Sequence, residues 1–106
     1  MEKQVTQTFE EVSKRLTAEK AHRINASYLF RIGQQEWSVD LTQSSNWIQQ
    51  GNTLPHPQCT ITVENPQDWI LLVEDKLNPT MAFMQGKIRV TGQISLALKL
   101  QTLLSN

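Results

Sequence analysis

The chain has 106 residues, which is enough for one domain with a single hydrophobic core. Ten lysine and arginine residues balance ten aspartate and glutamate residues, so the formal net charge is zero. A chain without excess positive charge has no long-range attraction for nucleic acid or for an anionic membrane, and it contains no run of basic residues. We therefore expect no nucleic-acid binding.

The single cysteine, Cys59, cannot form an internal disulfide, which is typical of a reducing compartment. Residues 1–11 are polar and charged and do not resemble a signal peptide. No apolar run approaches the ~20 residues of a membrane-spanning helix. The last residues, 104–106, differ from a peroxisomal address of the Ser-Lys-Leu type. We expect a cytoplasmic protein.

The first predicted helix covers residues 6–21. It follows from Val5, Phe9, Val12 and Leu16, whose spacings of four, three and four residues form one apolar stripe. Acidic residues placed four positions before basic ones support an exposed face on the other side. We interpret this helix as a lid or buttress on a sheet, without a catalytic role.

The chain then changes to a period of two, which is typical of strands with one buried face. Apolar and polar residues alternate over residues 27–32 and again over 37–42. The glycine-containing turn at 33–35 joins the two runs into a predicted antiparallel hairpin. Residues 47–48 begin a shorter third strand, and residues 51–57, which contain two prolines, form a loop.

A fourth strand is predicted at residues 59–63 and a last one at 87–91, from the same alternation. Asn65 and Asn78 each precede a proline and are predicted to cap the N-termini of two short helices. This order predicts an α+β fold, a single domain over residues 1–106, with helices on one face of a mainly antiparallel five-stranded sheet.

The predicted C-terminal helix, residues 94–104, is unusually apolar. At ~100° per residue its apolar side chains span an arc of roughly 220°, whereas a surface helix needs only ~100°. Its second apolar side either packs between other elements or in a dimer, or it lines a cavity for a lipid. Gln85 and Gln101 are polar groups at this end of the chain that either bond within the fold or meet a lipid headgroup.

The sequence gives little support for catalysis. His22 and His56 have no recognisable partner for nucleophilic chemistry, and Cys59 is in phase with the apolar positions of its strand. One cysteine and two separated histidines do not form a zinc site, and no glycine-rich phosphate loop is present. We expect no enzyme activity, no metal and no cofactor.

Three motifs in order resemble one family. They are the strand 59–63 before a capped helix, Asn78-Pro79 followed by Ala82-Phe83 and Gln85-Gly86-Lys87, and the segment Leu96-Ala97-Leu98-Lys99-Leu100-Gln101. From about residue 59 to 103 the chain resembles the sterol carrier protein 2 domain, also called non-specific lipid-transfer protein, and the likeness is loose before that. The resemblance implies a hydrophobic tunnel that holds sterols, fatty acids, acyl-CoA thioesters or phospholipids.

The resemblance also nominates residues that line the tunnel. Methionine is flexible and suits a pocket for varied apolar shapes. Lys87, Arg89 and Lys99 are candidates to meet an anionic headgroup at the mouth. The predicted lining residues are Trp37, Val39, Ile61, Val63, Trp69, Val73, Met81, Phe83, Met84, Gln85, Ile88, Val90, Leu96 and Leu100.

The leading functional hypothesis is a carrier that binds and transfers apolar lipids with low specificity, because apolar contact is non-directional. Its partner is a lipid or another apolar small molecule, with transient membrane contact or partner enzymes as further expectations. The alternative is a non-catalytic accessory protein that presents a lipid, such as a quinone precursor, to partner enzymes. A fragment of an enzyme is a third hypothesis, suggested only by fusions within the family.

Overall fold

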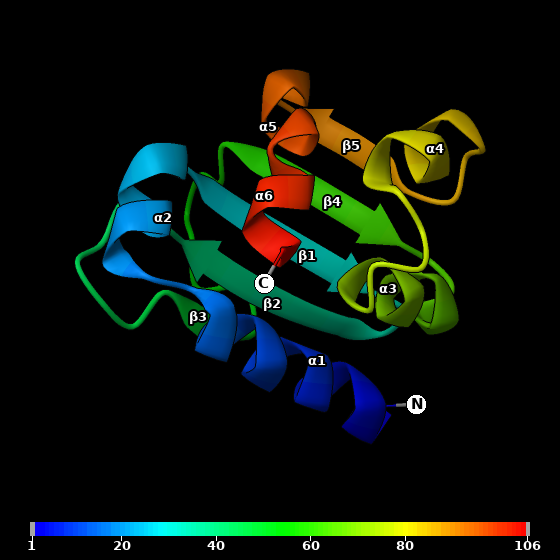
Figure 1. Cartoon of the computed structure of the whole chain (residues 1–106), viewed down its shortest axis with the longest axis horizontal. Helices are drawn as coiled ribbons and strands as arrows, with labels where there is room; N and C mark the ends of the chain where they lie inside the picture. The colour runs from blue at the N-terminus through cyan, green and yellow to red at the C-terminus, as the bar shows by residue number, and fades with distance from the viewer. Residues whose placement is uncertain (1, 106) are drawn as a thin grey trace.

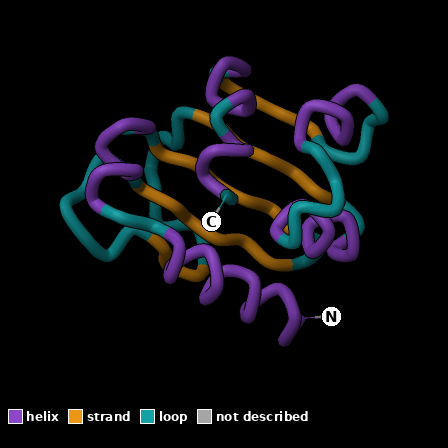
Figure 2. The backbone as a smooth tube through the Cα atoms, viewed as in Figure 1, coloured by secondary structure: helices purple, strands orange, loops and turns teal. Residues whose placement is uncertain are grey.

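The computed structural model of the chain describes residues 2–105. Helices cover one face of a five-stranded sheet, and the C-terminal helices lie over its middle (Figures 1 and 2). The predicted α+β class is therefore confirmed. The elements in chain order are α1 (Glu2–Arg15), α2 (Ala18–Ile24), β1 (Ser27–Ile32), β2 (Gln35–Asp40), β3 (Ile48–Gln50), β4 (Cys59–Val63), α3 (Pro66–Val73), α4 (Pro79–Met84), β5 (Arg89–Gly92), α5 (Ile94–Leu98) and α6 (Leu100–Leu104).

The sheet is mixed, with the strand order β3-β2-β1-β4-β5. Three neighbouring pairs are antiparallel, including the predicted hairpin of β1 and β2. The central pair, β1 and β4, is parallel, with Phe30 beside Ile61. The prediction of a mainly antiparallel sheet therefore missed one pairing, which joins the two halves of the sheet.

The loop between β3 and β4 explains the parallel pair. It crosses the face of the sheet that the helices leave open, where the Ser38 hydroxyl donates to the Gly51 carbonyl at 2.7 Å and accepts from the Thr53 amide at 2.9 Å. At the end of the loop the Gln58 amide donates to the Ser27 carbonyl at 3.1 Å. The loop thus carries the chain across β2 and β1, so that β4 runs beside β1 in the same direction.

The predicted helix 6–21 is two helices in the structure. The apolar stripe is buried as expected, but α1 ends at Arg15. The hydroxyl of Thr17 then accepts a hydrogen bond from the Lys20 amide at 3.1 Å and caps α2. A Thr N-cap satisfies an amide that would otherwise lack a partner, which fixes the start of a new helix at this point.

Both asparagine caps are confirmed. The Asn65 side chain accepts from the Gln67 amide at 3.0 Å, and the Asn78 side chain accepts from the amides of Thr80 and Met81 at 2.8 and 3.2 Å. Proline follows at the first helical position in each case, where no amide hydrogen is needed. The caps therefore set where α3 and α4 begin.

The C-terminal part differs from the prediction in two places. The last strand begins at Arg89 rather than at residue 87, so Ile88 is buried in the turn before β5. The predicted helix 94–104 is divided at Lys99 into α5 and α6. Gly92 allows the change from strand to helix, because its φ is +96° and a Cβ atom there would lie 2.5 Å from the Gln58 carbonyl oxygen.

Candidate functional site

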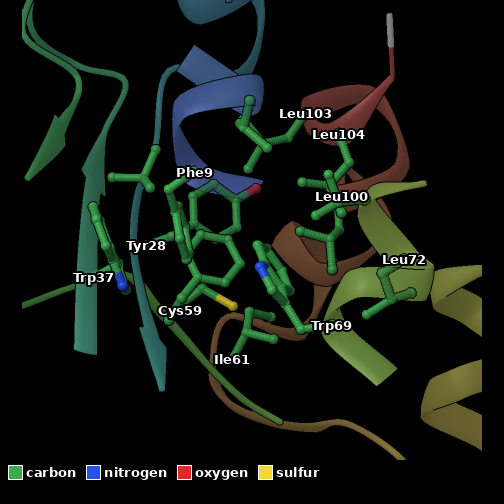
Figure 3. Close-up of a cluster of buried hydrophobic side chains, with 14 of the residues drawn as sticks. Phe9, Tyr28, Trp37, Cys59, Ile61, Trp69, Leu72, Leu100, Leu103 and Leu104 are labelled. Carbon is green, nitrogen blue, oxygen red and sulfur yellow. The ribbon is translucent and has the colours of Figure 1, made fainter. Parts of the chain in front are cut away.

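An aromatic cluster fills the space between the sheet and the helices (Figure 3). The ring of Phe9 on α1 stacks on Trp37 of β2 and on Trp69 of α3, with centroid distances of 4.5 and 5.0 Å. Phe30 of β1 also contacts Trp69, at 5.1 Å. Offset and stacked rings at these distances pack closely, so this part of the interior is filled by the protein's own side chains.

Two side-chain hydrogen bonds fix polar atoms within the cluster. The Tyr28 hydroxyl donates to the Leu96 carbonyl at 2.8 Å and joins β1 to α5. The Trp69 indole donates to the Thr8 hydroxyl at 2.7 Å and joins α3 to α1. Burial raises the pKa of the Tyr28 hydroxyl, and it raises the pKa of the neighbouring Cys59 thiol to about 11. Both groups therefore stay protonated at neutral pH.

Most of the predicted lining residues belong to this packed core. Nine of them are buried, and Val90 is partly buried against the cluster. They contact one another and the aromatic rings, so the described residues do not show the tunnel that the resemblance implies. The nine are Trp37, Val39, Ile61, Val63, Trp69, Val73, Ile88, Leu96 and Leu100.

The other four predicted lining residues lie at the surface, which corrects the expectation that they point inward. Met81, Phe83 and Met84 are 49%, 43% and 73% exposed, and Gln85 is exposed at the C-terminal end of α4. The reason is the shortness of α4, whose six residues bury only Pro79 and Ala82. A single turn and a half can present only one narrow side to the core.

Helix α5, which contacts α4, exposes two further large apolar side chains. Ile94 is 57% exposed and Leu98 is 69% exposed. They were not among the predicted site residues, although the wide apolar arc of residues 94–104 was the signal that could have identified them. We call the five exposed residues the α4–α5 surface: Met81, Phe83, Met84, Ile94 and Leu98.

The polar candidates lie around the same part of the molecule. The Gln101 side-chain oxygen is 3.5 Å from the Asn78 amide nitrogen, so Gln101 bonds at the rim of α4 rather than inside the core. Arg89 forms an ion pair with Glu64. Lys87 and Lys99 follow α4 and α5, and neither forms an ion pair with any carboxylate in the described part of the chain.

Arg15 holds three helices together, a role that sequence reasoning missed. Its guanidinium Nη1 donates to the carbonyls of Val73 and Leu104, each at 2.9 Å, where α3 and α6 end. Lys20 Nζ donates to the Ser105 carbonyl at 2.7 Å. A hollow of about 260 Å³ lies beside Arg15, and its lining includes the acidic residues Glu74 and Asp75. This mixed lining does not suit an acyl chain.

The described residues contain no cluster of three or more histidine, cysteine, aspartate or glutamate side chains that could hold a metal ion. None of the helices in residues 2–105 is both long and apolar enough to cross a membrane. The fold and the α4–α5 surface together define a small α+β domain that leaves apolar side chains uncovered on short helices.

Comparison with known proteins identifies the family. Residues 6–105 match the SCP-2 sterol transfer family. The chain therefore belongs to this family, as its motifs predict.

Two relatives and two solved structures illustrate the likeness. The chain is 34% identical over 108 residues to human sterol carrier protein 2, covering 90% of this chain and 19% of that protein. It is 30% identical over 105 residues to rat hydroxysteroid dehydrogenase-like protein 2, covering 96% and 20%. It thus spans about a fifth of the length of these relatives.

The crystal structure of sterol carrier protein 2 like 2 from Aedes aegypti superposes with a TM-score of 0.78, at 26% identity, over 94% of this chain and 95% of that one. The solution structure of the palmitated form of SCP2L2 from the same species has the same fold, with a TM-score of 0.73, 22% identity, and coverage of 97% and 93%.

Proposed function

We propose that the chain binds single-chain apolar lipids such as fatty acids and transfers them with low specificity, without catalysing a reaction itself. Family membership supports this proposal, as does the palmitated protein from Aedes aegypti, which shares the fold. One observation of this chain carries it. Met81 and Phe83 are each about half exposed, at 49% and 43%, on a short helix whose other side is part of the core.

The helices around these residues are suited to move. α4, α5 and α6 have six, five and five residues, and helices this short are not stable by themselves. Tertiary contacts keep them in place, among them the hydrogen bond from Tyr28 to the Leu96 carbonyl. A small displacement of these helices from the sheet exposes apolar side chains on both sides of the opening.

In this proposal the acyl chain enters beside Met81 and Phe83 and replaces contacts that the buried side chains of Leu96 and Leu100 make within the core. Each methylene moved from water into this environment contributes ~0.8 kcal/mol, so a long chain offsets the cost of separating the helices. Methionine adapts to different shapes, and apolar contact selects by volume rather than by identity.

The test is a titration of the chain with a fluorescent fatty acid in the absence of membranes. We expect saturable binding at micromolar concentration or below. Phe83→Gln should lose roughly tenfold in affinity, because the bound acyl chain would cover the amide and leave it without a hydrogen-bond partner. Leu54→Gln is the matched control, since Leu54 is also partly buried but lies near Ser38, on the far side of the sheet. Circular dichroism checks that both variants fold.

No binding by the wild-type chain refutes the proposed function. Equal weakening by Phe83→Gln and Leu54→Gln refutes the proposed entry at α4, although it leaves lipid binding itself in place.

A further inference from the structure

Aromatic side chains of the interior form a continuous row of ring contacts. Tyr28 contacts Phe30 with a centroid distance of 5.7 Å, and Phe30 contacts Phe9 at 5.9 Å. Phe9 then stacks on Trp37 at 4.5 Å, with the two ring planes 9° apart. The row therefore runs from Tyr28, whose hydroxyl bonds to α5, to Trp37 on β2, and Phe9 lies close to its far end (Figure 3).

The rings of this cluster belong to two different walls. Tyr28, Phe30 and Trp37 lie on the sheet, whereas Phe9 is carried by α1 and Trp69 by α3. Phe9 lies between Trp37 and Trp69, with ring centroids 4.5 and 5.0 Å away. Its ring therefore spans the space between the sheet and α3 and fills the far end of the interior.

The helix that carries Phe9 is held more firmly than the short helices α4, α5 and α6. The Thr8 hydroxyl, one residue before Phe9, accepts a hydrogen bond from the Trp69 indole at 2.7 Å. At the other end of α1, Arg15 donates to the last carbonyl of α3 at 2.9 Å. With 14 residues, α1 is also long enough to contribute to its own stability. An acyl chain that enters beside α4 therefore meets loosely held elements first and the fixed Phe9 ring last.

We propose that Phe9 sets the longest acyl chain that the protein accommodates. This inference rests on the proposed function and names the residue that determines its specificity. A chain that enters at α4 first replaces contacts of Leu96 and Leu100, which belong to the same buried cluster. It then extends over Tyr28 and Phe30 until its methyl end meets the Phe9 ring. A longer chain has to move this ring out of its stack between two indoles, which loses contacts on both faces of the ring, or leave its last methylenes in water.

A purely structural role for Phe9 predicts a different result. If the ring only stabilises the core, its removal weakens the binding of every fatty acid alike, because a smaller fraction of the protein is folded. A length limit acts only on chains long enough to reach the ring. The dependence of affinity on chain length therefore separates the two roles.

The experiment is competition with a fluorescent fatty acid, without membranes, by the series laurate, myristate, palmitate, stearate and arachidate. For the wild-type chain we expect affinity to rise by up to about fourfold per methylene until one length is reached, and then to level off or fall. Phe9→Ala should move this limit to a longer acid. Affinity for the first acid beyond the wild-type limit should then rise roughly tenfold, while affinities for shorter acids change much less.

Leu41→Ala is the matched control. Leu41 is buried to the same degree as Phe9, at 1% exposed, but it lies at a hollow beside α2 that Ala18 and His22 also line. This variant loses a similar core contact and should keep the wild-type length limit. Circular dichroism checks folding, and Phe9→Leu, which retains more of the core contacts, should shift the limit in the same direction if Phe9→Ala does not fold.

The inference is overturned if Phe9→Ala and Phe9→Leu keep the wild-type limit, or if Leu41→Ala shifts it equally. It is also overturned if the affinity of the wild-type chain still rises at arachidate. In each of these cases fatty-acid binding itself remains. Absence of binding of every acid to the wild-type chain refutes the proposed function, and the inference with it.

Discussion

The contact between Arg15 and the ends of two helices leads to a quantitative prediction about stability. Only 15% of the Arg15 side chain is exposed, and its Nη1 donates to the carbonyls of Val73 and Leu104. Hydrogen bonds to a charged donor contribute about 1.5–3 kcal/mol each. The Nε atom of the same group is buried without a partner in the described part of the chain, which offsets about 1–3 kcal/mol.

Arg15→Met keeps much of the apolar stem but removes the guanidinium, so two helix ends lose their donor. Water from the adjacent hollow can reach part of the site, and we expect a net loss of about 2–4 kcal/mol of unfolding free energy. With a urea m-value of about 1–3 kcal/mol/M, the midpoint should fall by roughly 1 M or more. Tryptophan fluorescence follows the transition, because Trp69 is fully buried.

Arg23→Met is the control, since Arg23 pairs with Glu19 on α2 while 66% of its side chain is exposed. An exposed pair of this kind contributes no more than about 1 kcal/mol. If Arg15→Met and Arg23→Met lose the same stability, the reasoning about the helix ends is wrong. Retention of full stability by Arg15→Lys would show that a charge is sufficient and that the two directed bonds are not needed.

Three further predictions concern the backbone, the buried thiol and a helix cap. Gly92→Ala should lower the free energy of unfolding in urea by about 2 kcal/mol more than Gly51→Ala does. Both glycines have a φ of +96°, but only a Cβ atom at Gly92 would lie 2.5 Å from the Gln58 carbonyl oxygen. Equal losses would contradict this clash. Between pH 9 and 10 the unfolded chain should lose the Cys59 proton, while the folded chain, with a thiol pKa of about 11, retains it. The free energy of unfolding should therefore fall by up to about 1.4 kcal/mol per pH unit. Cys59→Ala should flatten this slope, and an unchanged slope would exclude the thiol as its cause. Asn78→Ala should lower the free energy of unfolding by about 1 kcal/mol. Asn78→Asp should retain most of the stability, because its carboxylate can accept hydrogen bonds from the Thr80 and Met81 amides. Thermal unfolding followed by circular dichroism compares the two variants, and similar losses would rule out the cap.

Local chemistry made much of the fold predictable. The asparagine caps before Pro66 and Pro79 determine where two helices begin, and alternation matches the burial of side chains in β4. It does not match β1 and β2, where Leu29 and Ser38 on the other face are buried as well. The resemblance to the sterol carrier protein 2 domain implied the same class of fold, and the family match over residues 6–105 confirms the resemblance. These features depend on residues close together in the chain, so a sequence pattern contains them.

The missed features depend on contacts between distant residues. The parallel pairing of β1 and β4 requires the loop after β3 to cross the sheet, and no pattern within β4 itself reports its direction. The exposure of Met84 and Leu98 depends on how short α4 and α5 are and on what covers them, whereas their apolar character predicted only burial. Arg15 looked like one more charge on an exposed helical face, since its acceptors are carbonyls 58 and 89 positions away.

The two edges of the sheet affect how the protein behaves at high concentration. The edge strands β3 and β5 have only three and four residues, while the three central strands have five or six. Gln49 and Gln50 occupy most of β3, and Arg89 begins β5. Short, polar edge strands offer few free backbone groups for another molecule to extend the sheet. The helices can therefore expose apolar side chains while the edge strands resist pairing with strands of other molecules. Reversible contacts through the helices do not lead to ordered, amyloid-like aggregation through the sheet.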